Sequence, residues 1–539
     1  MVTGVLRADK GVATNIGATL LGDRYMQTCK NVNMVKRGVV TSRVRGWSKQ
    51  RASAFNGGVP FLDFGIFVAA NGTRTLLFQV GDDVDSYNIG TSTETVIFTG
   101  VSNTALPCFR AYAPYAAGTP YTVWCNGSDE PRKITSVTAS SLLQLNGANY
   151  GAAATAAPLA VKTYSKPTFV EPYLDRLVLA KFAGSGTEYD VVITNAGTGE
   201  TCTQSAPLVA TDGGVFTMNP ALGAITGLKA FKLSNESNEQ VLLVAQALGV
   251  TLITGEGATT FRSRQLTDEY GIPSNRTWVR VMNDLYFLAS DGIRCFSTLI
   301  QNSNLLTSSK TFGVQDLVNR WNQDQLAKAH AFHMRKYQEI VFWFPIDVDT
   351  DCKNAFVFNY GDSDNEPAIF PKDGTTVTCS TLFSNIPYGG GSDGVLQLHY
   401  SGTKYGDAAV AFRIALSPVH AEGDSRRSFQ ADFQIITEGP ANKFIPNCYG
   451  FVRTVSGKLM RKRMLPANQV KVVSDAAGSI LDSWALGVGA YPSEHTRITT
   501  FKPKGAAHMM DLELTGTDAD HDIDFVAAQF DLKLGGVNQ

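Results

Sequence analysis

The sequence predicts an all-β protein built from short antiparallel strands, and three observations support this prediction. Charged residues make up only 18% of the chain and hydrophobic residues 44%, whereas charge is ordinarily about 25% in soluble domains. The 50 glycines, with many Asn and Asp residues, supply frequent tight turns. Between these turns, runs of β-branched and aromatic residues recur at short and fairly even spacing, which is typical of successive hairpins.

The clearest hairpins lie between residues 240 and 297. Strands are expected at 240–245, 250–254, 278–282, 285–290 and 293–297. Asn283-Asp284 and Asp291-Gly292 separate the last three strands, because these residue types tolerate the positive φ of tight turns. Four or five short antiparallel strands in a row form a β-propeller blade, although sandwiches and meander sheets use the same unit.

The chain divides into three expected parts. Residues 1–55 are expected to form an irregular N-terminal arm, residues 56–430 a β-propeller of about six blades, and residues 431–539 a C-terminal β-rich domain, since the strand rhythm changes near its start. The Ala- and Asn-rich residues 140–160 and the Gly- and Thr-rich residues 197–227 are expected as loop insertions in the propeller.

One helix is expected over residues 314–334, with two alternatives for residues 323–333, which either continue the helix or break it. Its apolar face has the spacing i, i+3, i+4 and i+7, formed by Val314, Leu317, Val318 and Trp321. On this helix His330 and His333 would share one face. A zinc site would need a third ligand, and none is recognisable nearby, so the two histidines are interpreted as partly buried helix residues.

Composition excludes several classes of protein. The formal net charge is −1, whereas a dedicated nucleic-acid binder ordinarily carries a basic excess. The eight cysteines are scattered without a C-x-x-C pair, which favours buried free thiols and assembly in a reducing cytoplasm. No apolar run has the length of a signal peptide or of a membrane helix, so neither secretion by the usual route nor a membrane span is expected.

Two acidic runs imitate calcium loops. They are Asp347-x-Asp349-x-Asp351 and Asp518-x-Asp520-x-Asp522-x-Asp524. An EF-hand loop needs Gly at its sixth position and an acid at its twelfth, and neither run satisfies this. Solvated turns are the expected state, with a cation site of another kind as the alternative.

Glycine clusters and basic clusters are the remaining candidates for binding sites. The glycines at 184–189 and 389–391 do not sit between a strand and a helix with Lys-Ser/Thr, so no phosphate-binding loop is expected. The first basic cluster is interpreted as a solvated, twisted strand pair, with an arm that contacts an acidic neighbour or the DNA channel as the alternative; it contains Lys36, Arg37, Arg43, Arg45, Lys49 and Arg51. Two later clusters, Arg426-Arg427 and Arg461-Lys462-Arg463, are interpreted as a solvated or intersubunit salt-bridging strand, with a DNA contact as the alternative. No catalytic, cofactor-binding or metal-binding residue is assigned, and no enzymatic activity is expected.

Four groups of segments follow one another along the chain. They are NVNMVKRGVVTSRVRGW near the N-terminus, VLLVAQALGVTLITGEG followed by Gly-Ile-Pro-Ser and LYFLASDGIRCFS, a helix followed by YQEIVFWFP and NAFVFNY, and a Lys-Pro-Lys-Gly turn near the C-terminus. In this order they resemble the tail nozzle, or packaged-DNA-stabilisation, proteins of short-tailed bacteriophages, also called tail hub proteins. The resemblance spans most of the chain but not residues 140–227.

The resemblance implies a virion structural protein. Such a protein forms a homohexameric ring at the distal end of the phage tail, extends the DNA channel and retains packaged DNA until ejection. Its partners would be copies of itself, a tail adaptor or portal-proximal protein, a tail fibre or spike, and double-stranded DNA in passage. The alternative is a receptor-binding tail appendage that recognises host surface glycan. A glycan-degrading tailspike is a third hypothesis, but it ordinarily needs a long parallel β-helix, whose regular coils are not found.

Overall fold

A computed structural model describes most of the 539 residues, and all structural statements concern these. The described residues are 2–6, 10–14, 25–36, 39–41, 46–114, 118–145, 148–149, 162, 164–232, 240–281, 284–296, 309–360, 367–401, 404–408, 410–416, 419–420, 427–438, 445–453, 459–463, 471–473, 497–501, 504–507, 509–516 and 524–537. They confirm the all-β prediction, since the fold consists of antiparallel sheets with a few short helices.

Seven sheets of three or four strands follow one another in the described residues between 47 and 399. The first three are β6 (Phe61–Val68), β7 (Arg74–Val80), β8 (Asp83–Asn88) and β9 (Thr93–Thr99); β10 (Cys108–Tyr112), β11 (Tyr121–Cys125), β12 (Arg132–Ser136) and β13 (Ala139–Leu142); and β16 (Phe169–Tyr173), β17 (Arg176–Ala180), β18 (Asp190–Ile193) and β19 (Gly214–Thr217). The next two are β20 (Ile225–Lys232), β21 (Gln240–Gln246), β22 (Val250–Thr254) and β23 (Arg262–Thr267); and β24 (Val279–Val281), β25 (Asp284–Ala289) and β26 (Gly292–Cys295). The last two are β27 (His330–Met334), β28 (Glu339–Phe344), β29 (Asn354–Asn359) and β30 (Ala368–Asp373); and β31 (Cys379–Phe383), β32 (Ile386–Gly390), β33 (Leu396–His399) and β5 (Trp47–Lys49).

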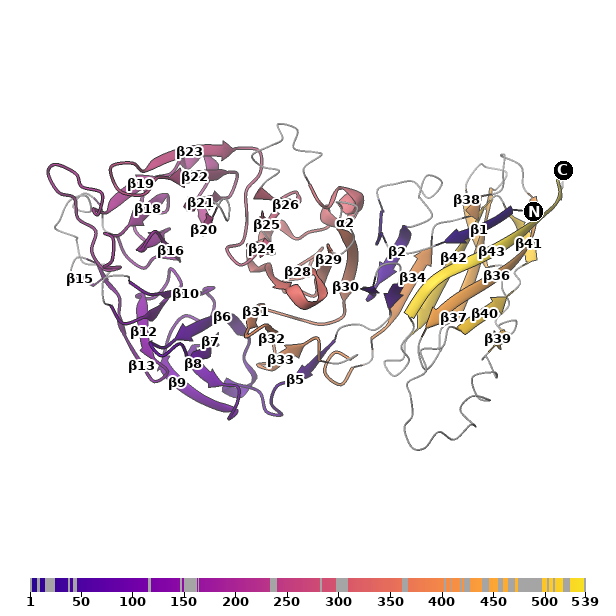
Figure 1. Ribbon diagram of the computed structural model, residues 1–539, viewed down its shortest axis with the longest axis horizontal. Coiled ribbons are helices and arrows are strands. Elements are labelled where there is room, and N and C mark those ends of the chain that lie inside the picture. The colour runs from indigo at the N-terminus through magenta and orange to yellow at the C-terminus, as the bar shows by residue number, and fades with distance from the viewer. Residues whose placement is uncertain are drawn as a thin grey trace.

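The seven sheets close into a ring. The first strand of most sheets contacts the first strand of the next, and β31 of the seventh sheet contacts β6 of the first. Between the fourth and fifth sheets a shared apolar cluster makes the contact, with Leu243 on one side and Phe287 on the other. Figure 1 shows the first strands facing the middle of the ring and strands such as β9 and β23 on its outside. Because each sheet buries both faces against its neighbours, the ring has no single core.

The seventh sheet is completed from the N-terminal side of the chain. β5 pairs with β33 in the register Leu398 to Ser48, and the Trp47 indole donates a 2.8 Å hydrogen bond to the Thr375 hydroxyl. This pairing joins the beginning of the ring to its end. The expected number of about six blades is not confirmed, since the described residues form a ring of seven sheets.

A second unit consists of two larger sheets. One contains β1 (Val2–Leu6), β3 (Asn33–Lys36), β4 (Val39–Thr41), β36 (Arg427–Glu438), β39 (Lys471–Val473), β40 (Arg497–Phe501), β41 (Lys504–Ala507) and β43 (Asp524–Val537). The other contains β2 (Met26–Lys30), β34 (Phe412–Leu416), β35 (Val419–His420), β37 (Ile445–Arg453), β38 (Leu459–Arg463) and β42 (Met509–Gly516). We call this part the two-sheet unit, and both chain ends lie in it (Figure 1).

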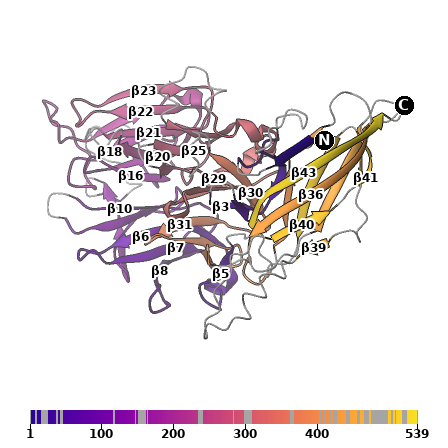
Figure 2. The same ribbon diagram turned by 45° about the vertical axis from the view of Figure 1, so that its right-hand side comes forward.

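The N-terminal residues, expected to form an arm, supply strands to this unit. β1 and β4 pair with β43, and β2 pairs with β34. The two-sheet unit also takes in β34, which lies ahead of the boundary expected near residue 430. Figure 2 shows the unit beside the ring, and in the ring the strands β20 to β23 follow one another outward.

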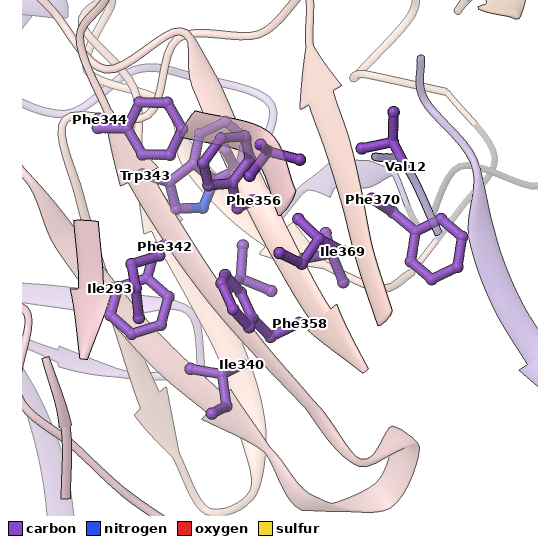
Figure 3. Close-up of a cluster of buried hydrophobic side chains, with 14 of the residues drawn as sticks. Val12, Ile293, Ile340, Phe342, Trp343, Phe344, Phe356, Phe358, Ile369 and Phe370 are labelled. Carbon is purple, nitrogen blue, oxygen red and sulfur yellow. The ribbon is translucent and has the colours of Figure 1, made fainter. Parts of the chain in front are cut away.

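One apolar cluster spans the ring and the two-sheet unit. It contains Phe344, Phe356 and Phe370 from the sixth sheet and Ile414 and Leu514 from the two-sheet unit. Figure 3 shows Val12 beside Phe370, where the N-terminal chain meets the edge of the ring. The amide of Val12 donates a 3.0 Å hydrogen bond to the Ile369 carbonyl. A shared buried core makes the two parts one packed body.

The junction is also fixed by polar contacts around Asn31. Its side-chain amide nitrogen donates to Asp373 at 3.0 Å, and its carbonyl oxygen accepts from the Asp373 amide at 2.9 Å. Lys30 forms a 2.8 Å ion pair with the same aspartate. These contacts couple β2 to β30 and restrict rotation of one part against the other.

The hairpins predicted at 240–254 and 278–297 are confirmed in the described residues, but a continuous helix over 314–334 is wrong. Only α2 (Gln315–Val318) is α-helical, and the short 3₁₀ helices η6 (Phe312–Val314) and η7 (Gln323–Lys328) flank it. Residues 330–334 form β27, with burial alternating along the strand. The predicted apolar face spans two short helical turns, after which the pattern changes to a period of two.

The two expected loop insertions contain strands. Within 140–160, residues 139–142 belong to β13, and β14 (Gln144–Leu145) pairs with β15 (Ala148–Asn149); residues 150–160 lie outside the described ranges. Within 197–227, β19 completes the third sheet and η4 (Pro220–Leu222) follows it. The described residues form two further 3₁₀ helices, η2 (Asn56–Gly58) and η8 (Arg335–Tyr337).

Candidate functional site

The segment 272–277 crosses the middle of the ring. Two of its contacts reach β20, the first strand of the fourth sheet: Thr226 donates to the Ile272 carbonyl at 2.6 Å, and Asn275 accepts from the Leu228 amide at 3.0 Å. A third contact reaches the residue before β27, since Ser274 donates to the Ala329 carbonyl at 2.6 Å. We call residues 272–277 the axial segment. Its hydrogen bonds hold a stretch of irregular chain where the first strands converge.

Arg276 of the axial segment joins three sheets. Its guanidinium donates to the carbonyl of Leu62 at 2.7 Å, of Thr378 at 3.3 Å and of Lys328 at 2.5 Å. These carbonyls belong to β6 or precede β31 and β27. An arginine suits this position because its planar fork carries five donors and stays charged at every physiological pH.

A cavity of about 570 Å³ opens on one side of the axial segment. Six cationic residues and one acid, Asp63, line it, and the cations are Arg74, Arg110, Lys229, Arg276, Arg280 and Arg335. They come from five sheets and the axial segment, so only closure of the ring brings them together. We call this space the axial basic cavity.

Two smaller cavities, of about 240 and 420 Å³, also reach the axial segment. Arg276 lines all three cavities, and Asn275 lines the axial basic cavity and the smaller of the other two. The axial segment therefore forms a partition between them.

Glu171 fixes two of the cations in place. Its carboxylate lies between Arg110 and Lys229, with a 3.1 Å contact to Lys229, and accepts the Ala230 amide at 3.2 Å. The Glu171 side chain is only 5% exposed, while Arg110 and Lys229 are 27% and 28% exposed. Burial acts to raise the pKa of Glu171, but Lys229 and Arg110 outweigh it and hold the pKa below its usual value.

Asp63 responds in the opposite direction. Burial raises the pKa of this carboxyl, and the nearby Arg276 and Arg110 oppose the shift without cancelling it. Asp63 therefore takes up a proton at a higher pH than an exposed aspartate does. Protonation removes the negative charge of Asp63 from the lining, so the positive potential inside the axial basic cavity rises as the pH falls.

The first acidic run is a set of ion pairs. Asp347 takes a two-pronged contact from Arg320 at 2.6 and 3.1 Å, Asp349 pairs with Lys353 at 2.9 Å, and Asp351 lies 3.6 Å from Lys328. Asp518, Asp520 and Asp522 lie outside the described ranges, and Asp524 begins β43. Within the described ranges, no group of three His, Cys, Asp or Glu side chains is placed to hold a metal ion.

The prediction that His330 and His333 share one face of a helix is wrong, because both residues lie on the strand β27. His330 is buried, whereas His333 is partly exposed and contacts the Tyr360 hydroxyl at 2.6 Å. Burial is the main cause that lowers the pKa of both, and it lowers that of His330 far more. Along a strand, residues three apart point to opposite faces, so the pair cannot chelate one ion.

The glycine clusters serve packing and turns. Gly389 and Gly390 lie within β32, and a Cβ at Gly390 would overlap the Phe61 side chain. Residues 184–189 connect β17 to β18, with Thr187 donating to the Gly184 carbonyl. Neither cluster leads into a helix as a phosphate-binding loop does.

Of the predicted basic clusters, Lys49 and Arg51 have described side chains, and neither lines the axial basic cavity. Lys49 pairs with Asp407 at 3.1 Å, and Arg51 pairs with Glu94 at 2.7 Å while covering the Phe55 ring. Arg37, Arg43, Arg45 and Arg426 lie outside the described ranges, and of Lys36, Arg427, Arg461, Lys462 and Arg463 only the backbone is described.

Sequence reasoning missed the axial basic cavity. Its six cations are spread over residues 74–335 as single charges, without a run or repeat. Three of them lie on first strands: Arg110 on β10, Lys229 on β20 and Arg280 on β24. Their position on the first strand of each sheet could have indicated the cavity. To use this signal, the order of the sheets around the ring would have to be known.

Comparison with known proteins leaves the family open. No family model matches the chain, and no curated protein does. Among solved structures, the computationally designed Ika8 protein is similar at 12% identity, over 64% of this chain and 98% of the designed chain, with a TM-score of 0.33. That similarity is too low to carry an assignment. No helix in the described part of the chain is long and apolar enough to cross a membrane.

Proposed function

We propose that the ring of seven sheets is a seven-bladed β-propeller and that the protein is a structural component of a phage tail. The closure of the seventh sheet by β5 supports the first part, because a strand from the other end of the ring locks it shut. The order of the segments that resemble phage nozzle proteins supports the second part. In this proposal copies of the chain form a homohexameric ring at the distal end of the tail.

The single observation that carries the proposal is the packing of the propeller onto the two-sheet unit. One apolar cluster and the Asn31 contacts join them, and both ends of the chain lie in the two-sheet unit. A protein that surrounds pressurised DNA must resist deformation, and a close-packed interior has low compressibility. The mechanism is mechanical: each copy is a stiff wall element, and the DNA is retained until ejection.

The path of the DNA follows from the axial segment. Residues 272–277 occupy the propeller axis, and the axial basic cavity holds only about 570 Å³. A DNA duplex, whose major groove alone is about 12 Å wide, cannot pass there. In the proposed assembly the DNA channel therefore runs between copies of the chain. A net charge of −1 limits retention of DNA on that wall, because phosphate contacts from Lys and Arg dominate DNA affinity.

Electron-microscopic class averages of the purified protein and of virion tails test the proposal. We expect rings of six copies from the purified protein and the same ring at the distal end of the tail, beside the tail adaptor and the fibres or spikes. A solitary or trimeric particle, or labelling of the protein at the tip of a fibre, would contradict the ring.

The second candidate function is a receptor-binding tail appendage that recognises host surface glycan. The axial basic cavity is the specific observation that favours it, since its volume lies within the roughly 300–1,000 Å³ of ligand sites. Binding of the isolated protein to cells of the host, with no ring in class averages, would favour this function over the nozzle.

A further inference from the structure

We infer that the axial basic cavity binds a small acidic saccharide, one that carries carboxylate groups and neutral hydroxyls together. The inference goes beyond the ring role, because the cavity would bind its ligand whether or not the copies assemble. It rests on the distribution of charge around the lining, on the rigidity of the cations, and on buried donors among the lining residues.

The lining is asymmetric. The cations Arg110, Lys229, Arg280 and Arg335 come from the second, fourth, fifth and sixth sheets. The seventh sheet contributes neutral hydroxyl and amide groups instead, from Ser380, Thr381, Ser384 and Asn385. A ligand that satisfies both sides needs an anionic group and several neutral hydrogen-bonding groups, which an acidic sugar provides and inorganic phosphate does not.

Two of the cations are positioned before any ligand arrives. Arg276 is held by three carbonyls, and Arg110 is held by the buried carboxylate of Glu171. Groups that are fixed in advance lose less conformational entropy on binding. Because Arg276 and Arg110 already donate to these protein acceptors, they contribute positive charge at fixed positions. Fixed charge favours a ligand with an anionic group at a defined position.

Three residues of the lining carry buried donors without a partner. They are Arg276 at Nε, Trp278 at Nε1 and Ser380 at Oγ, and the described residues offer none of them a hydrogen bond. Buried donors are nearly always paired. These three lie on both sides of the lining, where small side-chain shifts would give them the oxygen atoms of a saccharide.

Titration calorimetry with trigalacturonate, at 50 mM salt and neutral pH, tests the inference. Arg335→Gln removes a cation from the cavity, and Lys336→Gln is the matched control because Lys336 lies on the same turn η8 but not in the lining. We expect saturable binding to the unaltered protein, a loss of roughly tenfold or more in affinity for Arg335→Gln, as for a hydrogen bond to a charged group, and a change within about twofold for Lys336→Gln.

Two further probes separate a saccharide site from a simple anion site. A neutral galactose trisaccharide and sodium phosphate should each bind at least tenfold more weakly than trigalacturonate. The inference is overturned by absence of binding, by equal binding of either probe, or by equal weakening in Lys336→Gln. Class averages of Arg335→Gln should still show rings of six copies, because Arg335 is proposed to act in saccharide binding and not in assembly.

Discussion

Replacing Glu171 by glutamine should destabilise the protein because it leaves two cations without their shared partner. Glu171 is 5% exposed and contacts both Arg110 and Lys229. Removal of one partner from a fully buried ion pair costs about 3–5 kcal/mol. Since both cations are more than a quarter exposed, solvent compensates part of this loss, and we expect about 2 kcal/mol at pH 7.

The pH dependence of this loss has a definite sign. The pKa of Glu171 is lower in the folded protein than its ordinary value, so its contribution is fully present above the unfolded pKa of about 4.3. The contribution is lost as the pH falls through the lower, folded pKa. Glutamine does not titrate. The difference in unfolding free energy between the unaltered protein and Glu171→Gln should therefore shrink below about pH 4.3.

Urea unfolding followed by tryptophan fluorescence, at pH 7 and at pH 3.5, measures both quantities. Asp407→Asn is the control, because Asp407 is 91% exposed in its pair with Lys49 and should leave the midpoint unchanged. A Glu171→Gln variant as stable as the unaltered protein, or a stability difference that stays constant between the two pH values, would refute this reasoning.

Three other predictions concern the ring of seven sheets and the thiols of the chain. Arg176 is 1% exposed and donates to the carbonyls of Thr194, Ala210 and Asp212. Arg176→Met should therefore lower the free energy of unfolding by about 3 kcal/mol and speed proteolysis within residues 197–213. Unchanged cleavage would contradict this prediction. Trp47 is 9% exposed and begins β5, the strand that completes the seventh sheet. Trp47→Ala should therefore lower the free energy of unfolding by about 3 kcal/mol and speed hydrogen exchange of the β33 amides. Unchanged protection of these amides would count against closure of the ring by β5. The thiols whose surroundings are described, Cys29, Cys108, Cys125, Cys202, Cys295, Cys352 and Cys379, are all buried, so a maleimide should label at most Cys448 in the folded protein; mass spectrometry that finds two or more labels would contradict this.

Features set by neighbours along the chain could be predicted from sequence. The hairpin of β21 and β22 is confirmed because a short turn and the alternation of side chains determine it locally. The helix over 314–334 failed because its apolar spacing persists for only two turns, and the alternating burial of 330–334 then belongs to a strand. Local patterns decide local structure, and here the pattern changed within the predicted element.

Features set by contacts between distant residues could not be predicted. The seventh sheet needs β5, which pairs with a strand about 350 residues away in sequence, so its composition is invisible in any window of the chain. The axial basic cavity depends on the order of sheets in the same way. Nothing in the sequence indicates that Arg110 and Lys229 lie close together, and only the fold brings Glu171 between them.

The most direct test of the account is a cryo-EM map of the virion tail with DNA inside. The account predicts six copies around a central channel, each with a seven-bladed propeller whose axis is filled by residues 272–277, and duplex density between the copies. Duplex density running through a propeller, or a map in which the protein lies only at the tail periphery, would contradict it.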